Sequence, residues 1–70
     1  MNAREMFEQL GYRYREIDDD VFQYSRANSI VIRFYKKERE FCSVEFFGPK
    51  NITMDEFKAI QQQLKELEWI

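Results

Sequence analysis

The feature that most constrains the fold lies between residues 12 and 47, where four short runs are rich in aromatic and β-branched residues. The runs span residues 12–17, 21–26, 30–36 and 40–47, and polar clusters of three residues separate them. Short apolar runs bounded by turn-forming residues are typical of antiparallel strands joined by tight turns. We therefore predict a meander of four strands over these four ranges.

The segment after this region carries the signals of a helix. Thr53 and Glu56 have the spacing of a capping box, and Ile52 and Phe57 occupy the two positions of a hydrophobic staple. An apolar stripe follows at helical spacing, made of Phe57, Ile60, Leu64 and Leu67. The pattern predicts a helix over residues 54–67.

The first residues predict a second, shorter helix. Asn2 and Glu5 again have capping-box spacing, and Gly11 is suited to end the helix because only glycine takes the left-handed conformation without strain. One apolar stripe runs between them, made of Ala3, Met6, Phe7 and Leu10. A helix with a single apolar side has to pack against another element.

Turn length sets the register of the strands. Because side chains alternate between the two faces of a sheet, a shift of one residue sends a whole strand to the wrong face. Three-residue turns pair Tyr14 with Tyr24, Phe22 with Phe34, Tyr24 with Ile32, Phe34 with Cys42, Ile32 with Val44, and Ile30 with Phe46. They gather one apolar face, made of Tyr14, Phe22, Tyr24, Ile30, Ile32, Phe34, Cys42, Val44 and Phe46. Asn28 is expected in the left-handed position of the second turn.

These elements predict a two-layer α+β fold with the order α-β-β-β-β-α and with both helices on one face of the sheet. The chain is expected to form a single domain over residues 1–70. The other face of the sheet is then left open, and it is the candidate interaction surface.

The open face combines arginine with aromatic and aliphatic residues, and arginine and aromatic residues are enriched at binding hot spots. The candidate site residues are Arg13, Arg15, Val31, Arg33, Tyr35, Phe41 and Phe47. The alternative is that the face binds nothing, with Tyr35 paired to Phe41 across the strands and Arg33 neutralised by Glu45.

The residue inventory argues against catalysis. The chain has no histidine, and its one cysteine, Cys42, is expected to point inward as an inert thiol. The one dense acidic run, at residues 18–20, lacks the spaced ligands, the glycine and the late glutamate of a calcium loop. We therefore name no catalytic residue, metal ligand, cofactor or small-molecule substrate. No apolar run approaches the ~20 residues of a membrane span, and no signal peptide is recognised, so a cytoplasmic protein without membrane contact is expected.

The partner that we expect is a protein, or a second copy of the chain. With a net charge of −2 and an isoelectric point near 5.1, the chain lacks the overall positive charge that attracts nucleic acid. The alternative function is weak binding of single-stranded nucleic acid by the same arginine and aromatic residues.

Both ends resemble a family of small orphan proteins encoded by phages and prophages of Gram-positive bacteria. The resemblance rests on residues 2–8 and 10–12 at one end, and on residues 52–54, 58–60 and 66–69 at the other. It implies a cytoplasmic accessory protein and assigns no functional residue. It also leads us to expect glycine before the terminal tryptophan, where this chain has Glu68.

The apolar tail, Trp69 and Ile70, is expected to fold back onto the first helix near Leu10. A contact between this tail and a partner is the alternative, because tryptophan is favoured at interfaces.

Overall fold

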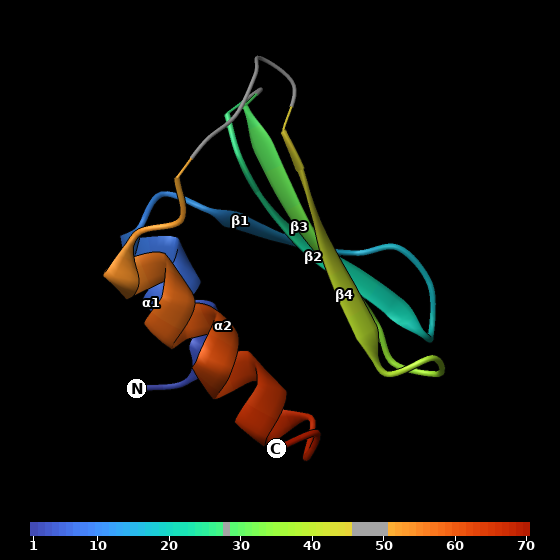
Figure 1. The fold of residues 1–70 in the computed structure, drawn as a ribbon. Helices are drawn as coiled ribbons and strands as arrows, with labels where there is room; N and C mark the ends of the chain where they lie inside the picture. Colours follow the sequence, from blue (N-terminus) through green and yellow to red (C-terminus); the bar gives the residue numbers. More distant parts are fainter. Residues whose placement is uncertain (28, 46–50) are drawn as a thin grey trace.

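The computed structural model describes residues 1–27, 29–45 and 51–70. Its elements, in chain order, are α1 (Ala3–Gln9), β1 (Arg13–Glu16), β2 (Val21–Arg26), β3 (Ile30–Tyr35), β4 (Glu40–Glu45) and α2 (Met54–Glu66). In the described residues the strands form one antiparallel sheet in the order β1-β2-β3-β4, and both helices lie on the same side of it (Figure 1). The predicted α-β-β-β-β-α fold is confirmed.

Both predicted capping boxes are present. The Asn2 side chain accepts a hydrogen bond from the Glu5 amide at 2.8 Å, and Glu5 accepts one from the Asn2 amide at 3.1 Å. In α2, Thr53 accepts from the Glu56 amide at 3.1 Å, and Glu56 accepts from the Thr53 amide at 3.0 Å. Each cap satisfies backbone donors that the first helical turn leaves without a partner.

The end of α1 follows the glycine-capped pattern that the sequence predicts. Gly11 has a φ of +88°, and the Tyr12 amide donates to the Phe7 carbonyl at 3.0 Å. This reversal directs the chain from α1 into β1. It also brings the Tyr12 ring edge-on to the Phe7 ring, with centroids 5.4 Å apart.

The end of α2 has the same geometry, with Glu68 in the position of the glycine. Glu68 has a φ of +61°, and the Trp69 amide donates to the Leu64 carbonyl at 2.9 Å. The Trp69 ring then packs 6.4 Å from the ring of Phe34 in β3. The predicted contact with α1 near Leu10 is wrong. The helices run antiparallel, which leaves Leu10 beside the first turns of α2, where it lines the same depression as Asp55 and Lys58.

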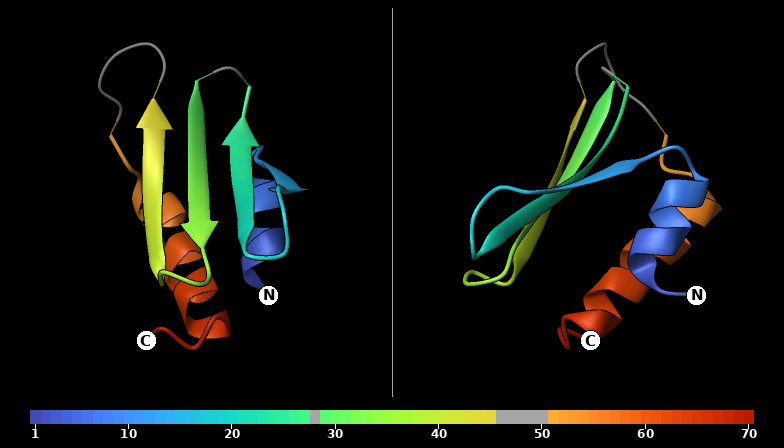
Figure 2. Two further views of the ribbon diagram at one scale, coloured as in Figure 1. Left: turned by 90° about the vertical axis from the view of Figure 1, so that its right-hand side faces the viewer. Right: turned by 180° about the vertical axis from the view of Figure 1, so that it is seen from behind.

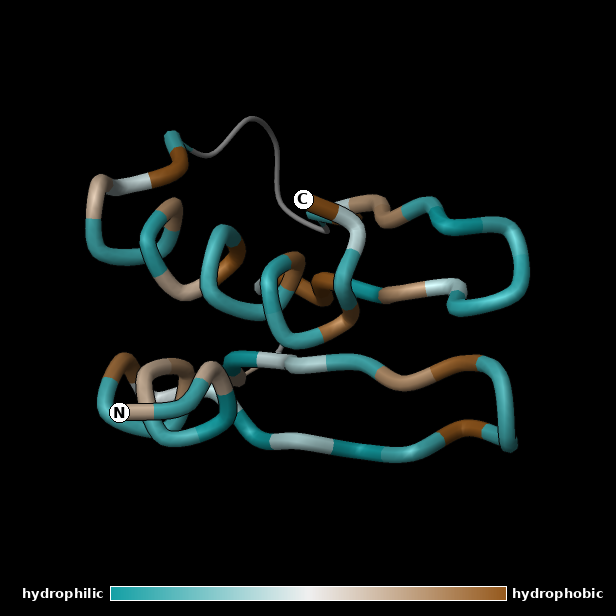
Figure 3. Tube along the Cα trace, turned by 90° about the horizontal axis from the view of Figure 1, so that it is seen from below, coloured by the Kyte–Doolittle hydropathy of each residue, from teal (hydrophilic) through white to brown (hydrophobic). Residues whose placement is uncertain are grey.

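The predicted register is confirmed for the first three strands. Tyr14 lies opposite Tyr24 and Phe22 opposite Phe34, which follows from a three-residue turn at 18–20 and another at 27–29. Ala27 takes a positive φ of 47°, whereas Asn28, predicted for such a position, lies outside the described residues. Figure 3 shows the first and third turns, residues 18–20 and 36–39, as hydrophilic tips that project beyond the helices on the same side.

The register of β4 differs from the prediction by one residue. The turn from β3 to β4 has four residues, 36–39, and places Tyr35 opposite Glu40. Phe34, Ile32 and Ile30 therefore lie opposite Phe41, Ser43 and Glu45, each one position earlier on β4 than predicted. The left-handed residue of this turn is Arg39, with a φ of 57°. Phe46, another predicted core position, lies outside the described residues.

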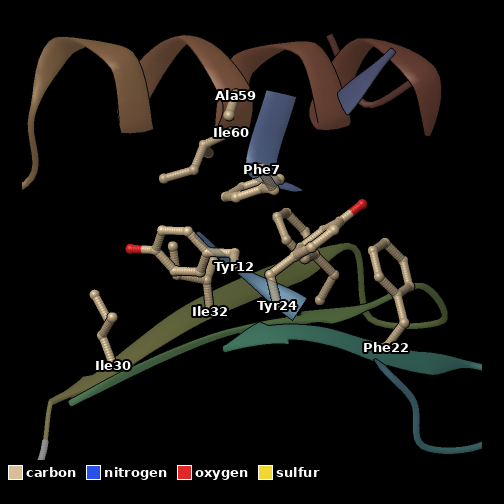
Figure 4. Close-up of a cluster of buried hydrophobic side chains, with 9 residues drawn as sticks. Phe7, Tyr12, Phe22, Tyr24, Ile30, Ile32, Ala59 and Ile60 are labelled. Atoms are coloured by element: carbon tan, nitrogen blue, oxygen red, sulfur yellow. The ribbon is translucent and has the colours of Figure 1, made fainter. Parts of the chain in front are cut away.

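The hydrophobic core lies between the sheet and the two helices (Figure 4). Among the described residues, the closest ring contact joins the two layers, because Phe7 of α1 stacks on Tyr24 of β2 with centroids 4.0 Å apart. The buried cluster consists of Phe7, Tyr12, Phe22, Tyr24, Ile30, Ile32, Phe34, Ala59 and Ile60.

Two buried tyrosines, Tyr12 and Tyr24, form hydrogen bonds with polar side chains on the inward face of α2. The Tyr12 hydroxyl donates to Glu56, and the Tyr24 hydroxyl donates to Gln63 Oε1 at 2.6 Å. Glu56 and Gln63 are seven residues apart, about two helical turns, so one stripe of α2 carries both polar side chains inward. Phe57, which the apolar stripe places in the core, is instead 48% exposed.

Candidate functional site

The open face of the sheet has a defined grid of side chains, because residues directly opposite each other in a sheet share a face. One row contains Arg13, Ser25, Val31 and Val44, and the next contains Arg15, Gln23, Arg33 and Cys42. A third row contains Val21, Tyr35 and Glu40. Figure 2 shows this face uncovered, with α1 and α2 behind the strands.

Positive charge is concentrated at the β1 side and centre of this face. Arg13 and Arg15 are exposed on β1, and Arg33 is half-buried on β3. Within residues 1–27, 29–45 and 51–70, the recorded ion pair joins Arg26 to Glu56 and involves none of these three arginines. The acid on the face is Glu40, at the opposite end of β4 from Val44.

Arg33 is held in place by a neighbour on β2. Its Nε and Nη2 atoms donate to Gln23 Oε1 at 3.1 and 2.8 Å, and the Gln23 side chain is buried. A neutral amide orients the guanidinium without neutralising it. The Arg33 charge therefore stays available to an acidic group approaching from solvent.

A shallow depression of about 250 Å³ lies at the β1 side of the same face. Arg13 and Arg15 line it together with Tyr14 and Ser25. Two guanidinium groups around a small hollow form a setting suited to carboxylate oxygens, which arginine recognises with paired donors.

Five of the seven predicted site residues, Arg13, Arg15, Val31, Arg33 and Tyr35, lie on this face. Phe41 does not, because the shifted register turns it to the helix-covered side, where its ring stacks on Phe34 at 5.6 Å. Phe47 lies outside the described residues.

The same shift brings two residues to the open face that were predicted to be buried. Cys42 is exposed, and Val44 is 44% exposed. The expectation of an inward-pointing thiol is therefore wrong. Its cause is the four-residue turn, which exchanges the two faces of β4.

The interpretation that the face is internally neutralised is also wrong. Tyr35 lies opposite Glu40 rather than Phe41. Glu45 lies opposite Ile30 and so faces the helices, whereas Arg33 faces solvent. The shift of β4 thus removes from the open face the acid that was expected to balance Arg33.

Sequence reasoning did not anticipate the polar cluster around Glu56. This carboxylate is 1% exposed, accepts from the Tyr12 hydroxyl and lies 3.9 Å from the Arg26 guanidinium. Burial, followed by the hydrogen bond to Glu56, raises the pKa of the Tyr12 hydroxyl well above its usual value of 10.0. The capping box identified Glu56 as a helix cap but held no signal of its burial.

Two kinds of feature are absent from the residues that the structure describes. Within that part of the chain, no group of three or more His, Cys, Asp or Glu side chains is placed to hold a metal ion. None of its helices is both long and apolar enough to cross a membrane.

In comparisons with known proteins, the chain matches no family model, no curated protein and no solved structure.

Proposed function

We propose that this chain is a non-enzymatic interaction module that binds an acidic surface of a partner protein through the open face of its sheet. The observation that carries the proposal is the group of Arg13, Arg15 and Arg33, which lack ion-pair partners within the described residues. They lie beside Val31 and Val44, so the face offers both apolar area and unbalanced charge. Such a face attracts carboxylates and then buries aliphatic surface once they arrive.

Charge favours a different protein over a second copy of the chain as the partner. Two copies packed face to face would bring three arginines against three arginines, and like charges in contact oppose association. The chain as a whole is negative, with a net charge of −2, so the positive face is a local feature.

Binding of single-stranded nucleic acid through this face is the second candidate, and the register of β4 weakens it. Stacking of bases needs several exposed rings beside the positive charge. With Phe41 turned away, Tyr35 is the aromatic residue that the described strands present there.

The resemblance of both helices to phage and prophage proteins supports a further part of the proposal. We place the module in the cytoplasm of an infected or lysogenic Gram-positive bacterium, as an accessory protein that binds a host or viral protein. This placement rests on the resemblance and not on the geometry of the face.

The test is affinity capture from a Gram-positive host lysate by three immobilised proteins. One is the wild type, one is Arg13→Gln/Arg15→Gln/Arg33→Gln, and the control is Lys37→Gln/Lys58→Gln/Lys65→Gln, which removes three charges away from the face. We expect the wild type and the control to capture the same protein in similar amounts. The arginine variant should capture at least about tenfold less of it. Retention should weaken as salt shortens the Debye length below its value of about 8 Å at 0.15 M.

Nuclease treatment of the lysate separates the two candidates. Capture of a protein that persists after nuclease supports the proposal. Equal capture by the arginine variant would overturn the role of the face, and capture that disappears with nuclease would favour nucleic acid.

A further inference from the structure

A second surface of the molecule, on the opposite side of the sheet from the open face, has the features of a small-molecule site. A groove of about 390 Å³ opens between the start of α1, the second half of α2 and the β1–β2 side of the sheet. This volume falls within the ~300–1,000 Å³ that is usual for small-molecule pockets.

The wall of the groove on the sheet side is aromatic. Tyr14, Phe22 and Tyr24 line it, and their ring centroids lie between 5.5 and 6.0 Å from one another. Figure 4 shows Phe22 and Tyr24, two residues apart on β2, on the side of the sheet that faces the helices, with the Tyr24 hydroxyl directed away from Ile30. Phe22 and Tyr24 are buried, so the half-buried Tyr14 ring is the one that a flat, apolar ligand group can contact.

Gln63 supplies a hydrogen-bond donor beside these rings. Its side chain is 93% buried (7% exposed), and Oε1 accepts from the Tyr24 hydroxyl, which fixes the amide with Nε2 on the other side. In the described residues Nε2 donates to no partner, whereas every fully buried side-chain nitrogen or oxygen there has one. Nε2 therefore reaches solvent, and the groove that Gln63 lines gives it that access.

Two cations line the same groove. The Arg4 guanidinium lies 4.1 Å from the centre of the Tyr14 ring, and the Lys36 ammonium lies 5.6 Å from the centre of the Phe22 ring. The acid in the lining is Glu66, whose Oε2 already accepts from the Ala3 amide at 2.7 Å and from Gln62 at 3.0 Å. The lining thus has an excess of positive charge and of donors.

We propose that this groove binds a small aromatic anion, with the ring against the half-buried Tyr14 and the anionic group held by Arg4, Lys36 and the Gln63 amide. Aromatic contact supplies apolar burial, and the two cations with one neutral donor select a carboxylate over a neutral group. Tyr14 lines both this groove and the depression on the open face, but Arg4, Lys36 and Gln63 line the groove alone, so the variants that test the groove leave Arg13, Arg15 and Arg33 of the proposed function intact.

The test uses three matched probes in an NMR titration of the ¹⁵N-labelled protein: indole-3-acetate, the neutral indole-3-acetamide, and acetate. A ligand of this size is expected to bind with a Kd on the order of 1 mM. We expect indole-3-acetate to give saturable shifts at the Gln63 side-chain amide and at the backbone amides of Arg4, Tyr14 and Lys36. The amide and acetate should bind at least about tenfold more weakly.

Variants identify the cations. Arg4→Gln/Lys36→Gln should weaken indole-3-acetate at least about tenfold, whereas Lys37→Gln, the neighbour outside the groove, should leave the Kd unchanged. The proposal would be overturned by shifts that do not saturate, or by shifts that are equal for the acid and its amide. It would also be overturned if Lys37→Gln weakened binding as much as Arg4→Gln/Lys36→Gln does.

Discussion

The strands β2 and β4 are both six residues long, but different interactions hold them in the sheet. β2 lies between β1 and β3, and it sends Phe22 and Tyr24 into the core under the helices. β4 is an edge strand whose first five residues are exposed on both faces. Burial therefore decides the register of β2, whereas the four-residue turn and the ring contact between Phe34 and Phe41 decide that of β4.

This difference determines the composition of the open face. When both faces of a strand are about equally exposed to solvent, burial favours neither orientation of its side chains. The register is then set by the turn before the strand. In β4 the four-residue turn places Val44 and Cys42 on the open face and turns Glu45 toward the helices. The positive charge of the face thus depends on the least buried strand of the sheet.

The largest expected effect comes from truncating one phenylalanine of the core beneath the helices and one of the edge strand β4. Phe34→Ala removes a fully buried ring and should cost about 3–5 kcal/mol of unfolding free energy. Phe41→Ala removes a ring that is 44% exposed and should cost about 1–2 kcal/mol. Urea denaturation measures both, with Phe34→Leu as a milder variant should Phe34→Ala fail to fold. Equal losses at the two positions would remove the distinction between the regions.

The buried core should also determine how the stability of the fold changes at alkaline pH. Burial is the main cause that raises the pKa of both Tyr12 and Tyr24 above the usual 10.0. The unfolded chain then releases these protons first, so stability is complete below pH 10 and falls as the pH rises above it. Each tyrosine contributes a slope of up to about 1.4 kcal/mol per pH unit. Thermal denaturation between pH 8 and 11 measures the fall, and Tyr24→Phe should reduce its slope. A stability that is flat to pH 11 would contradict the assignment.

The tyrosine hydroxyls offer a third contrast. Tyr24→Phe leaves the buried Gln63 carbonyl without its donor and should cost about 1–3 kcal/mol, and Gln63→Leu added to it should recover most of the loss. Tyr35→Phe, on the open face, should change stability by less than about 0.5 kcal/mol. Chemical denaturation of the four proteins checks this, and a Tyr35 effect as large as that of Tyr24 would count against it.

The helices, their caps, the four strands and the register of the first three strands could be predicted because each has a local or burial-based signal. Asn2 with Glu5, Thr53 with Glu56, and Gly11 are recognisable from a few neighbouring residues. The register of β1–β3 follows because only one parity buries Phe22, Tyr24 and Ile32 together.

The positions that could not be predicted depend on contacts distant in sequence or on weak preferences. Tyr12 and Tyr24 turn Glu56 and Gln63 inward from opposite ends of α2, which no pattern within residues 54–67 reveals. The turn at 36–39 is polar throughout, and nothing in its sequence distinguishes three residues from four. The groove beside Gln63 arises from both helices and two strands, so the sequence shows no motif for it.

A last expected effect concerns the end of α2, where Trp69 packs at the margin of the core. The resemblance led us to expect glycine at position 68, and Glu68 has the positive φ that glycine adopts without strain. Glu68→Gly should therefore raise stability by about 1 kcal/mol, and Gly11→Ala should lower it by a similar amount. An added Cβ at Gly11 would lie 3.6 Å from the Arg26 side chain, an ordinary contact, so the backbone alone sets the cost. Thermal denaturation of both variants checks the two signs, and a loss of stability in Glu68→Gly would contradict this explanation.

The position of β4 can be tested directly through the hydrogen bonds of its neighbour. The Lys36 amide donates to the Asp20 carbonyl, and bonded and non-bonded pairs alternate along an antiparallel ladder. The backbone amides of Ile32 and Phe34 therefore point toward β2, and their pairs with β4 are the close, non-bonded ones.

Nuclear Overhauser contacts between Hα protons across the β3–β4 pair are thus the most direct measurement. The structure predicts strong contacts from Phe34 to Phe41 and from Ile32 to Ser43. Contacts from Phe34 to Cys42 and from Ile32 to Val44 would show the opposite parity, return Glu45 to the arginine face, and contradict the account of the open surface.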